Sequence, residues 1–173
     1  MTQACDLTAT EARRLIGCKA LSPVELLESC IARIEAVNPS VNAVITTAFD
    51  RAREEARRAE QQVMAGAPLP PLHGLPVGIK DLAETAGIRT THGSLLYRNH
   101  VPTDDEASVA AIRRAGGIVF AKTNTPEFGA GASTTNALFG TTRNPFDRAR
   151  TCGGSSGGSA VALATRMMPL AHG

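Results

Sequence analysis

Hydrophobic residues recur at helical spacing in the first third of the chain. Residues 8–11, Thr-Ala-Thr-Glu, have the form of a capping box and precede such a stripe, so we expect a short helix that ends near Lys19. A longer apolar stripe follows Ser22 and runs through residues 24–37, and Pro39 with the asparagine before it is expected to end that helix. Both stripes predict helices that pack one face on a core.

The pattern changes twice before residue 72. Residues 41–45 show a period of two and predict a short strand. Residues 49–64 predict a helix whose mixed charges suit a solvated face better than a binding patch. Residues 65–71 are rich in proline and glycine. They mark the expected boundary between an N-terminal helical segment, residues 1–66, and a core segment, residues 67–173.

The core segment begins with a strand pattern. Residues 75–81 alternate, with Val77 and Ile79 on one face and Lys80 on the other. Because Lys80 ends an apolar strand, its stem is expected to be buried, and loss of hydration lowers a lysine pKa until the amine is a usable base. The alternative from the residues alone is a structural lysine, paired with Asp81 or exposed at the strand end.

Further elements of the core segment follow in alternation. Residues 106–114 predict a helix that Asp104 and Asp105 cap, and the continuous apolar run at residues 118–121 predicts a strand in a sheet covered on both faces. The order of strand, helix, strand, glycine-rich loop and helix indicates a layered α/β fold.

The glycine-rich stretch at residues 153–159, Gly-Gly-Ser-Ser-Gly-Gly-Ser, is the strongest candidate for a functional loop. A flexible linker explains it poorly, because the stretch has no repeat and runs directly into residues 160–164, which predict a buried helix. Residues 154–158 match the G-x-S-x-G pattern of a nucleophile elbow, but no convincing strand precedes them and no acid follows. A phosphate-binding loop would need a lysine after the glycines, and none stands there.

Composition excludes several classes of protein. The chain has 173 residues with a net charge of +2 and 3% aromatic residues, which argues against binding to nucleic acid or to an anionic membrane surface. No stretch has the form of a leader or the length of a membrane span, so we expect a cytoplasmic protein. The four cysteines show neither C-x-x-C pairing nor a histidine at ligand spacing, so free thiols are expected, and no metal or organic cofactor.

Four motifs, in this order, resemble those of the amidase signature family. They are HGLPVGIKD at residues 73–81, AKTNTPEFG at 121–129, RNPFD at 143–147 and CGGSSGGS at 152–159. That family includes bacterial amidases and the A-type component of the tRNA-dependent glutamine amidotransferase. The resemblance extends from about Leu21 to the end of the sequence.

The resemblance implies both a fold and a reaction. The fold is a layered α/β/α arrangement, a mixed sheet flanked by helices, of which this chain holds a part. The reaction is hydrolysis of a linear carboxylic amide, a small molecule, through an acyl-enzyme. Lys80 resembles the family's general base and acid, and Ser155 resembles a bridging serine on a cis peptide that passes a proton between the lysine and the nucleophile. Gly129 and Gly131 lie in a segment similar to the loop that lines the acyl pocket, and we expect them to contact the substrate.

In the family, the nucleophilic serine and the oxyanion hole lie in a segment expected shortly after Gly173. We therefore expect the chain to be the N-terminal part of an amidase, and its partner to be the remainder of that polypeptide. A homodimer is also possible. Three other interpretations stay open. The first is an inactive truncated fragment, the second is an A-type subunit of a glutamine-dependent tRNA amidotransferase, and the third is a non-enzymatic interaction module.

Overall fold

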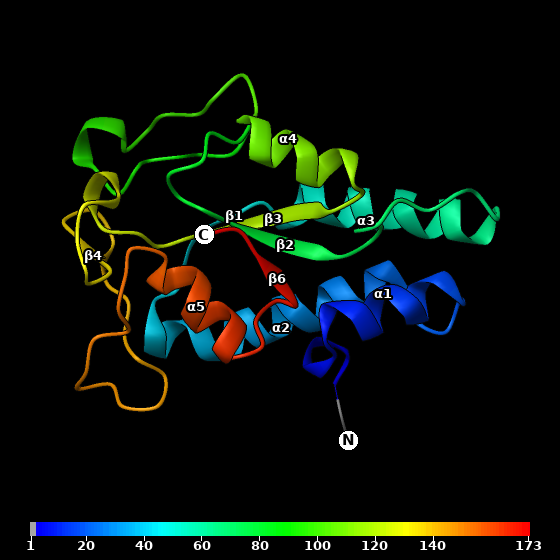
Figure 1. The fold of residues 1–173 in the computed structure, drawn as a ribbon, viewed down its shortest axis with the longest axis horizontal. Helices are drawn as coiled ribbons and strands as arrows, with labels where there is room; N and C mark the ends of the chain where they lie inside the picture. Colours follow the sequence, from blue (N-terminus) through cyan, green and yellow to red (C-terminus); the bar gives the residue numbers. More distant parts are fainter. Residues whose placement is uncertain (1–2) are drawn as a thin grey trace.

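A mixed sheet lies at the centre of the structure, a computed structural model that describes residues 3–173 (Figure 1). Residues 1 and 2 of the predicted helical segment lie outside the described residues. The spatial order of the strands is β1 (Val44–Thr47), β3 (Ile118–Thr123), β2 (Pro76–Lys80) and β6 (Leu170–Ala171). β1 pairs antiparallel with β3, whereas β2 pairs parallel with both β3 and β6.

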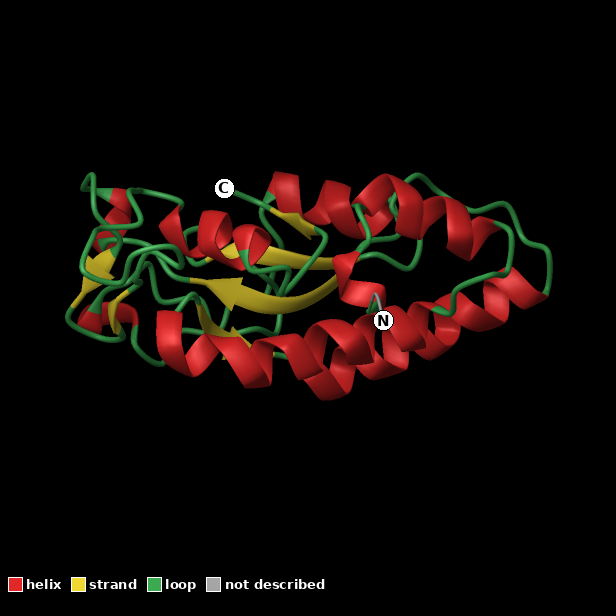
Figure 2. Cartoon of the chain, turned by 90° about the horizontal axis from the view of Figure 1, so that it is seen from below, coloured by secondary structure: helices red, strands yellow, loops and turns green. Residues whose placement is uncertain are grey.

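Helices cover both faces of this sheet (Figure 2). The α-helices are α1 (Ala9–Gly17), α2 (Pro23–Val41), α3 (Phe49–Met64), α4 (Ala107–Arg114) and α5 (Gly157–Ala164). The short elements are the 3-10 turns η1 (Ala4–Asp6), η2 (Leu95–Tyr97) and η3 (Glu127–Gly129) and the two-residue strands β4 (Thr135–Asn136) and β5 (Gly140–Thr141). The predicted α/β class with a mixed sheet between helices is confirmed.

Successive residues of β3 point to opposite faces of the sheet and separate two hydrophobic clusters. Val119 packs with Val77 and Ile79 of β2 against Val109 of α4. Phe120 belongs to the larger cluster on the other face, which contains side chains of α1, α2, α3 and α5. Because neighbouring residues of a strand alternate between faces, a strand covered on both sides must be apolar throughout. The continuous apolar run at residues 118–121 predicted this burial correctly.

Two N-terminal predictions from the sequence hold. The N–H of Glu11 donates to Thr8 Oγ1 over 3.2 Å, and the Glu11 carboxylate accepts the N–H of Thr8 over 3.0 Å, so the capping box is present at the start of α1. Helix α3 spans the predicted residues 49–64, with Ala52, Ala56 and other small residues on its buried face. The larger cluster contains residues of α1, α2 and α3 as well as β3, while the division of the chain at residue 66 stays a prediction.

The prediction that α2 ends at Pro39 was wrong. The helix continues through this proline to Val41, and Asn42 then takes a left-handed conformation with φ of 53°. The Asn38 side chain accepts the N–H groups of Ala43 and Val44 over 2.9 and 2.8 Å. Since these bonds satisfy the backbone beyond the last turn, the helix ends at Val41 with Asn42 as its C-cap, and β1 begins at Val44 rather than at residue 41.

The predicted cap of α4 was also wrong. Glu106 is the N-cap residue, and its side chain makes no capping hydrogen bond. Asp105 instead accepts the N–H of Ala86 over 2.8 Å and forms an ion pair with Arg113 at 3.0 Å. The carboxylate that the sequence assigned to the helix therefore fastens the loop that follows β2.

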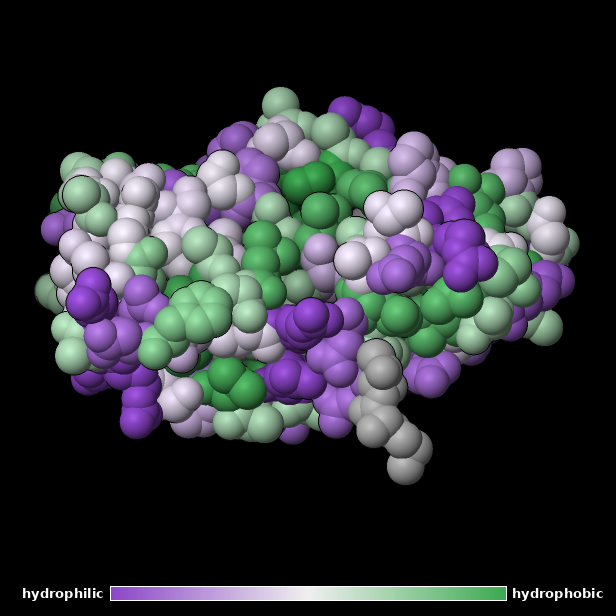
Figure 3. All heavy atoms as spheres, turned by 60° about the horizontal axis from the view of Figure 1, so that its bottom comes forward, coloured by the Kyte–Doolittle hydropathy of each residue, from purple (hydrophilic) through white to green (hydrophobic). Residues whose placement is uncertain are grey.

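The surface has hydrophobic groups among charged ones. On the face that carries α1, α2 and α5, hydrophobic side chains lie in several patches separated by charged groups (Figure 3). Phe146 is 86% exposed and Leu163 of α5 is 41% exposed. Among residues 3–173, no helix combines the length and the hydrophobicity that crossing a membrane requires.

Candidate active site

Lys80 is the last residue of β2, in the middle of the sheet. It pairs with Thr123 of β3 in the parallel ladder, and it is 7% exposed. Ligands of open α/β sheets bind at the carboxyl ends of parallel strands, because the loops that leave those ends meet there. The strand therefore places a buried amine at the edge of the sheet where a site is expected.

The amine of Lys80 contacts the glycine-rich loop. Its Nζ lies 2.8 Å from Ser155 Oγ and 2.9 Å from Ser156 Oγ, and it donates to both hydroxyls when protonated. The peptide bond between Gly154 and Ser155 is cis. The structure thus brings together the two residues that the sequence nominated as catalytic, and it adds Ser156 as a second hydroxyl at the same amine.

Lys80 has hydroxyl partners and no acidic one. Among residues 3–173, no carboxylate forms an ion pair with its amine. The neighbouring carboxylate of Asp81 faces away and accepts hydrogen bonds from the N–H and the hydroxyl of Thr91. Desolvation by burial lowers the pKa of Lys80, because the charged form loses hydration without gaining a counter-charge. The alternative of a lysine paired with Asp81 does not hold.

The loop that presents the serines is held by residues that the sequence reasoning did not single out. Thr134 Oγ1 donates to the carbonyl of Gly153 over 2.9 Å and accepts the N–H of Gly157 over 3.1 Å. The N–H of Gly158 donates to the carbonyl of Asn124 over 3.2 Å. Thr134 and Asn124 therefore fix both sides of the loop, and a threonine and an asparagine in irregular segments carry no sequence signal of this role.

Two of the glycines are required by close approach. A Cβ on Gly157 would lie 2.2 Å from Thr134 Oγ1, and one on Gly158 would lie 2.3 Å from the backbone nitrogen of Asn124. Such distances are far below van der Waals contact, so neither position accepts a side chain unless its neighbours move. The glycines let the start of α5 pack against the end of β3, which brings the serines to Lys80. The predicted loop is thus shorter than expected, since α5 already begins at Gly157.

The predicted substrate-contacting glycines lie in a loop beside this centre. The carbonyl oxygen of Gly131 is 3.1 Å from the point where a Cβ on Gly154 would stand, so this loop packs against the serine loop. Gly129 adopts a φ of 71°, and its open side faces Leu82, just beyond Lys80. Both glycines are therefore near the serine loop or the end of β2, and their contact with a substrate stays a prediction.

Ser159 and His172 form a second polar contact near the centre. Ser159 Oγ donates to the His172 carbonyl over 2.8 Å and lies 2.7 Å from Thr123 Oγ1. Among the described residues, His172 Nδ1 is buried and has no hydrogen-bond partner, and burial lowers the pKa of this ring. Because Ser159 is buried and engaged on both sides, it is a poorer candidate for a reacting hydroxyl than Ser155 or Ser156.

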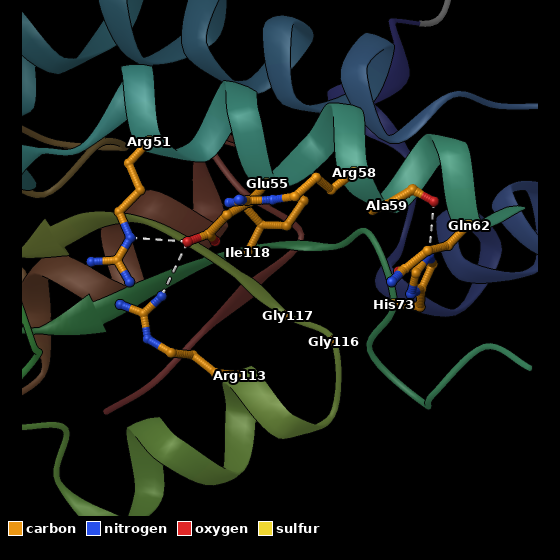
Figure 4. A pocket seen from close by; sticks show the side chains of 10 residues that line it. All are labelled: Arg51, Glu55, Arg58, Ala59, Gln62, His73, Arg113, Gly116, Gly117 and Ile118. Carbon is orange, nitrogen blue, oxygen red and sulfur yellow. Dashed lines mark hydrogen bonds and ion pairs between the residues drawn. The ribbon is translucent and has the colours of Figure 1, made fainter. Parts of the chain in front are cut away.

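A pocket of about 330 Å³ lies elsewhere, between α3 and the start of β3, and it carries several arginines (Figure 4). Glu55 lies between Arg51, at 2.9 Å, and Arg113, at 3.4 Å. One carboxylate is thus shared by two guanidinium groups, and Arg58 lines the same pocket, so the pocket keeps a net positive charge. Its lining includes neither Lys80 nor Ser155.

Comparison with known proteins identifies a family that the chain resembles in sequence. A family model described as Amidase matches residues 25–173. The chain is 44% identical over 161 residues to the A-type component of a glutamyl-tRNA(Gln) amidotransferase of Geobacter sp. strain M21, covering 93% of this chain and 33% of that protein. It is 41% identical over 167 residues to an acylamidase of Rhodococcus erythropolis, covering 96% of this chain and 35% of the relative.

Solved structures agree with the sequence relatives. A bacterial aryl acylamidase, described as one of the amidase signature enzymes, superposes with a TM-score of 0.91 at 35% identity, covering 95% of this chain and 34% of that one. The chain spans about a third of the length of the curated relatives that it matches.

Proposed function

This chain belongs to the amidase signature family, and from that membership and the geometry at β2 we propose that it supplies the proton-transfer part of an amide-hydrolysing active site. Lys80 is the general base and acid of the proposal, and Ser155 is the bridging hydroxyl. The observation that carries it is the 2.8 Å contact between Lys80 Nζ and Ser155 Oγ, made by an amine with no acidic partner among the described residues.

The proposed reaction starts from a neutral Lys80. The amine takes the proton of Ser155 Oγ, while Ser155 takes the proton of the attacking serine, whose oxygen adds to the amide carbonyl. The proton then returns through Ser155 to the nitrogen of the substrate, the C–N bond breaks, and ammonia or an amine leaves. Water attacks the acyl-enzyme by the same route and releases the acid. Burial lowers the pKa of Lys80 from its usual 10.5, which makes the neutral amine more accessible as a base and its protonated form a better acid.

The attacking serine is assigned by the family resemblance to polypeptide that follows Gly173. The substrate is a linear carboxylic amide whose acyl part lies along the loop of Gly129 and Gly131. That the chain does not bind nucleic acid directly, that it can form a homodimer and that it is cytoplasmic all remain predictions.

Ser156 offers a second route within the same chain. Its Oγ lies 2.9 Å from Lys80 Nζ, and a hydroxyl at that distance from a neutral amine has the arrangement of a nucleophile with its base. If residues 1–173 hydrolyse amides without further polypeptide, Ser156 is the attacking residue and not the bridging one.

A second function has a specific observation in its favour. Several relatives with 41–44% identity are named as A-type components of glutamyl-tRNA(Gln) amidotransferases. In that case the same Lys80 and Ser155 would release ammonia from glutamine for a partner protein, instead of releasing an amine to solvent. The chemistry at β2 is common to both functions, so the distinction lies in the partner.

The test measures ammonia release from simple carboxylic amides and from glutamine, by residues 1–173 and by the longest polypeptide that the gene encodes. The proposal predicts hydrolysis by the longer polypeptide, together with labelling of a serine by an amide-mimicking phosphonate. Co-purification with a tRNA-binding partner and activity confined to glutamine would favour the amidotransferase. Neither hydrolysis nor serine labelling in any form of the protein would refute both functions and favour an interaction module.

A further inference from the structure

The loop between β2 and α4 brings three metal-ligating side chains to one point. Glu84 Oε1 lies 2.8 Å from His92 Nε2, and Glu84 Oε2 lies 3.0 Å from His100 Nε2. One ligand atom from each residue falls within 4.8 Å of the other two. We propose that Glu84, His92 and His100 form a binding site for a divalent transition-metal ion, with Zn²⁺ or Co²⁺ as the best fit.

Backbone hydrogen bonds hold the three residues in place. The Glu84 carbonyl accepts the N–H of Glu106 over 2.9 Å, the His100 carbonyl accepts that of Thr90 over 3.0 Å, and the His92 carbonyl accepts that of Phe128 over 2.8 Å. Each ligand therefore has its main chain fastened to a different neighbouring segment. Such a fixed backbone lowers the entropy lost when the side chains bind an ion.

A buried lysine of β3 forms hydrogen bonds with the same loop. Lys122 Nζ donates to the carbonyl of Ala83 over 2.6 Å and to the hydroxyls of Thr85 and Thr90 over 2.8 and 2.9 Å. These contacts flank Glu84 in the sequence and fix the start of the loop. The backbone on both sides of Glu84 is therefore held in place.

Aromatic packing orients the two imidazoles. Tyr97 contacts the His92 ring edge-to-face, with centroids 4.9 Å apart, and the His100 ring with centroids 5.6 Å apart. Phe128 stacks on His92 at 6.3 Å. Since both Nε2 atoms point to the Glu84 carboxylate, they already converge as ligands of one ion would.

The donor set selects the class of ion. Imidazole nitrogen with carboxylate oxygen suits Zn²⁺, Co²⁺ and neighbouring transition metals, whereas Ca²⁺ and Mg²⁺ prefer sites built from oxygens. Two Zn²⁺ ligands at tetrahedral angles stand about 3.3 Å apart, so the present nitrogen–oxygen distances of 2.8 and 3.0 Å need to widen by a few tenths of an ångström. Three protein ligands leave one coordination position for water.

The surroundings provide access and charge. A pocket of about 390 Å³ opens beside the cluster, and it is lined by Glu84 and His100 together with Asp104, Asp105 and Glu106. These carboxylates give the approach a negative potential, which draws in a cation. All three ligands are partly exposed, so an ion reaches them without opening the fold.

This site departs from the sequence-based expectation of no metal ligands. Glu84, His92 and His100 lie in a segment without a helical or strand pattern, so their convergence had no periodicity to reveal it. The inference does not rest on the proposed amide hydrolysis. Its competitor is a metal-free clamp in which Glu84 accepts one hydrogen bond from each histidine.

Titration of the chain with cobalt chloride, followed by competition with zinc chloride, distinguishes the metal site from the metal-free clamp. We expect a single cobalt ion per chain, with a visible spectrum of nitrogen and oxygen ligation. Because the chain also has free cysteines, the spectrum must be checked for the charge-transfer band of cobalt–thiolate ligation, which we expect to be absent. His92→Asn, His100→Asn and Glu84→Gln should each weaken binding by more than the roughly 10–100-fold loss caused by losing a partner outside the coordination sphere. His172→Asn, which changes a histidine outside the cluster, should leave the affinity unchanged.

Two results would overturn the site. One is wild-type cobalt binding no tighter than that of the His92→Asn, His100→Asn double variant. The other is a wild-type spectrum of thiolate ligation. Circular dichroism of each variant establishes that it is folded, and Glu84→Gln, which keeps the size and the acceptor oxygen of the side chain, provides the test if a histidine variant does not fold.

Discussion

Lys80 Nζ lies 2.8 Å from Ser155 Oγ, although the two residues are 75 positions apart in the sequence. The first ends a buried strand, and the second lies in a loop whose glycines allow it to reach that strand. The contact therefore depends on the sheet and on the packing of α5, and it makes the mechanism testable at single residues.

Replacing either partner of this contact should remove proton transfer. In the longest polypeptide that the gene encodes, Lys80→Met and Ser155→Ala should each lower kcat/KM for an amide by roughly 10²–10⁴-fold, the usual contribution of general acid–base catalysis. Ser156→Ala is the matched control, since it removes the other hydroxyl at the same amine and should cost far less. A larger loss in Ser156→Ala than in Ser155→Ala would exchange the roles of the two serines.

The pH dependence of the reaction should follow the ionisation of Lys80. The neutral amine is the active form, so kcat/KM should rise with pH and level off above the lysine pKa, which burial places below the usual 10.5. A pH–rate profile from pH 5 to 10 measures this rise. A rate that falls over the same range, in a protein that stays folded, would contradict a basic role for Lys80.

The ionisation of Lys122 should make the free energy of unfolding increase with pH. Burial lowers its pKa to about 8. Below that pH both the folded and the unfolded chain hold the proton, whereas between about pH 8 and 10.4 the unfolded chain holds it more tightly, so the free energy of unfolding rises with pH by about 3 kcal/mol. Cys30, whose pKa burial raises to about 12, works in the opposite direction above about pH 9, so the test is a comparison between variants. Between pH 7 and pH 10, urea denaturation should show a more positive change in the free energy of unfolding in the wild type and in Lys19→Met, which changes an exposed lysine, than in Lys122→Met. An equal change in all three proteins would show that Lys122 makes no such contribution.

A methyl group at residue 158 should disturb the serine loop. In Gly158→Ala the new Cβ would stand 2.3 Å from Asn124 N and 2.6 Å from Asn124 O, both of them backbone atoms. We expect a loss of about 1–3 kcal/mol in the free energy of unfolding, as for overpacked cores. Ala160→Ser, on the exposed side of the same helix, should change it by less than about 0.5 kcal/mol. Equal stability of the two variants in urea would contradict the tight packing of α5 on β3.

The sequence predicted the elements whose signals are local. The capping box at Thr8 and the periodicity of residues 49–64 gave the start of α1 and the bounds of α3, because both depend on neighbours in the chain. The end of α2 was missed because the Asn38 side chain accepts the N–H groups of Ala43 and Val44 and Asn42 takes a left-handed conformation, so the chain turns at Asn42 and not at the proline. β6 was missed for a related reason, since its two residues become a strand only by pairing with β2.

The candidate site was predictable in part. The motifs around Lys80 and Ser155 indicated both residues, and the fold brings them into contact. Thr134 and Asn124, which fix the serine loop, act through long-range contacts that no spacing reveals. The convergence of His92 and His100 on Glu84 is likewise a property of the folded loop.

The most direct test of the account is the pKa of the Lys80 amine in the folded chain. The chain contains three lysines, Lys19, Lys80 and Lys122, so a sample with isotope-labelled lysine side chains gives few NMR signals, and single substitutions assign them. Titration should show Lys80 losing its proton below the usual 10.5, and Ser155→Ala should shift that titration because the hydroxyl is its partner. A Lys80 signal that titrates at or above 10.5, and does not respond to Ser155→Ala, would contradict a neutral amine within reach of that serine.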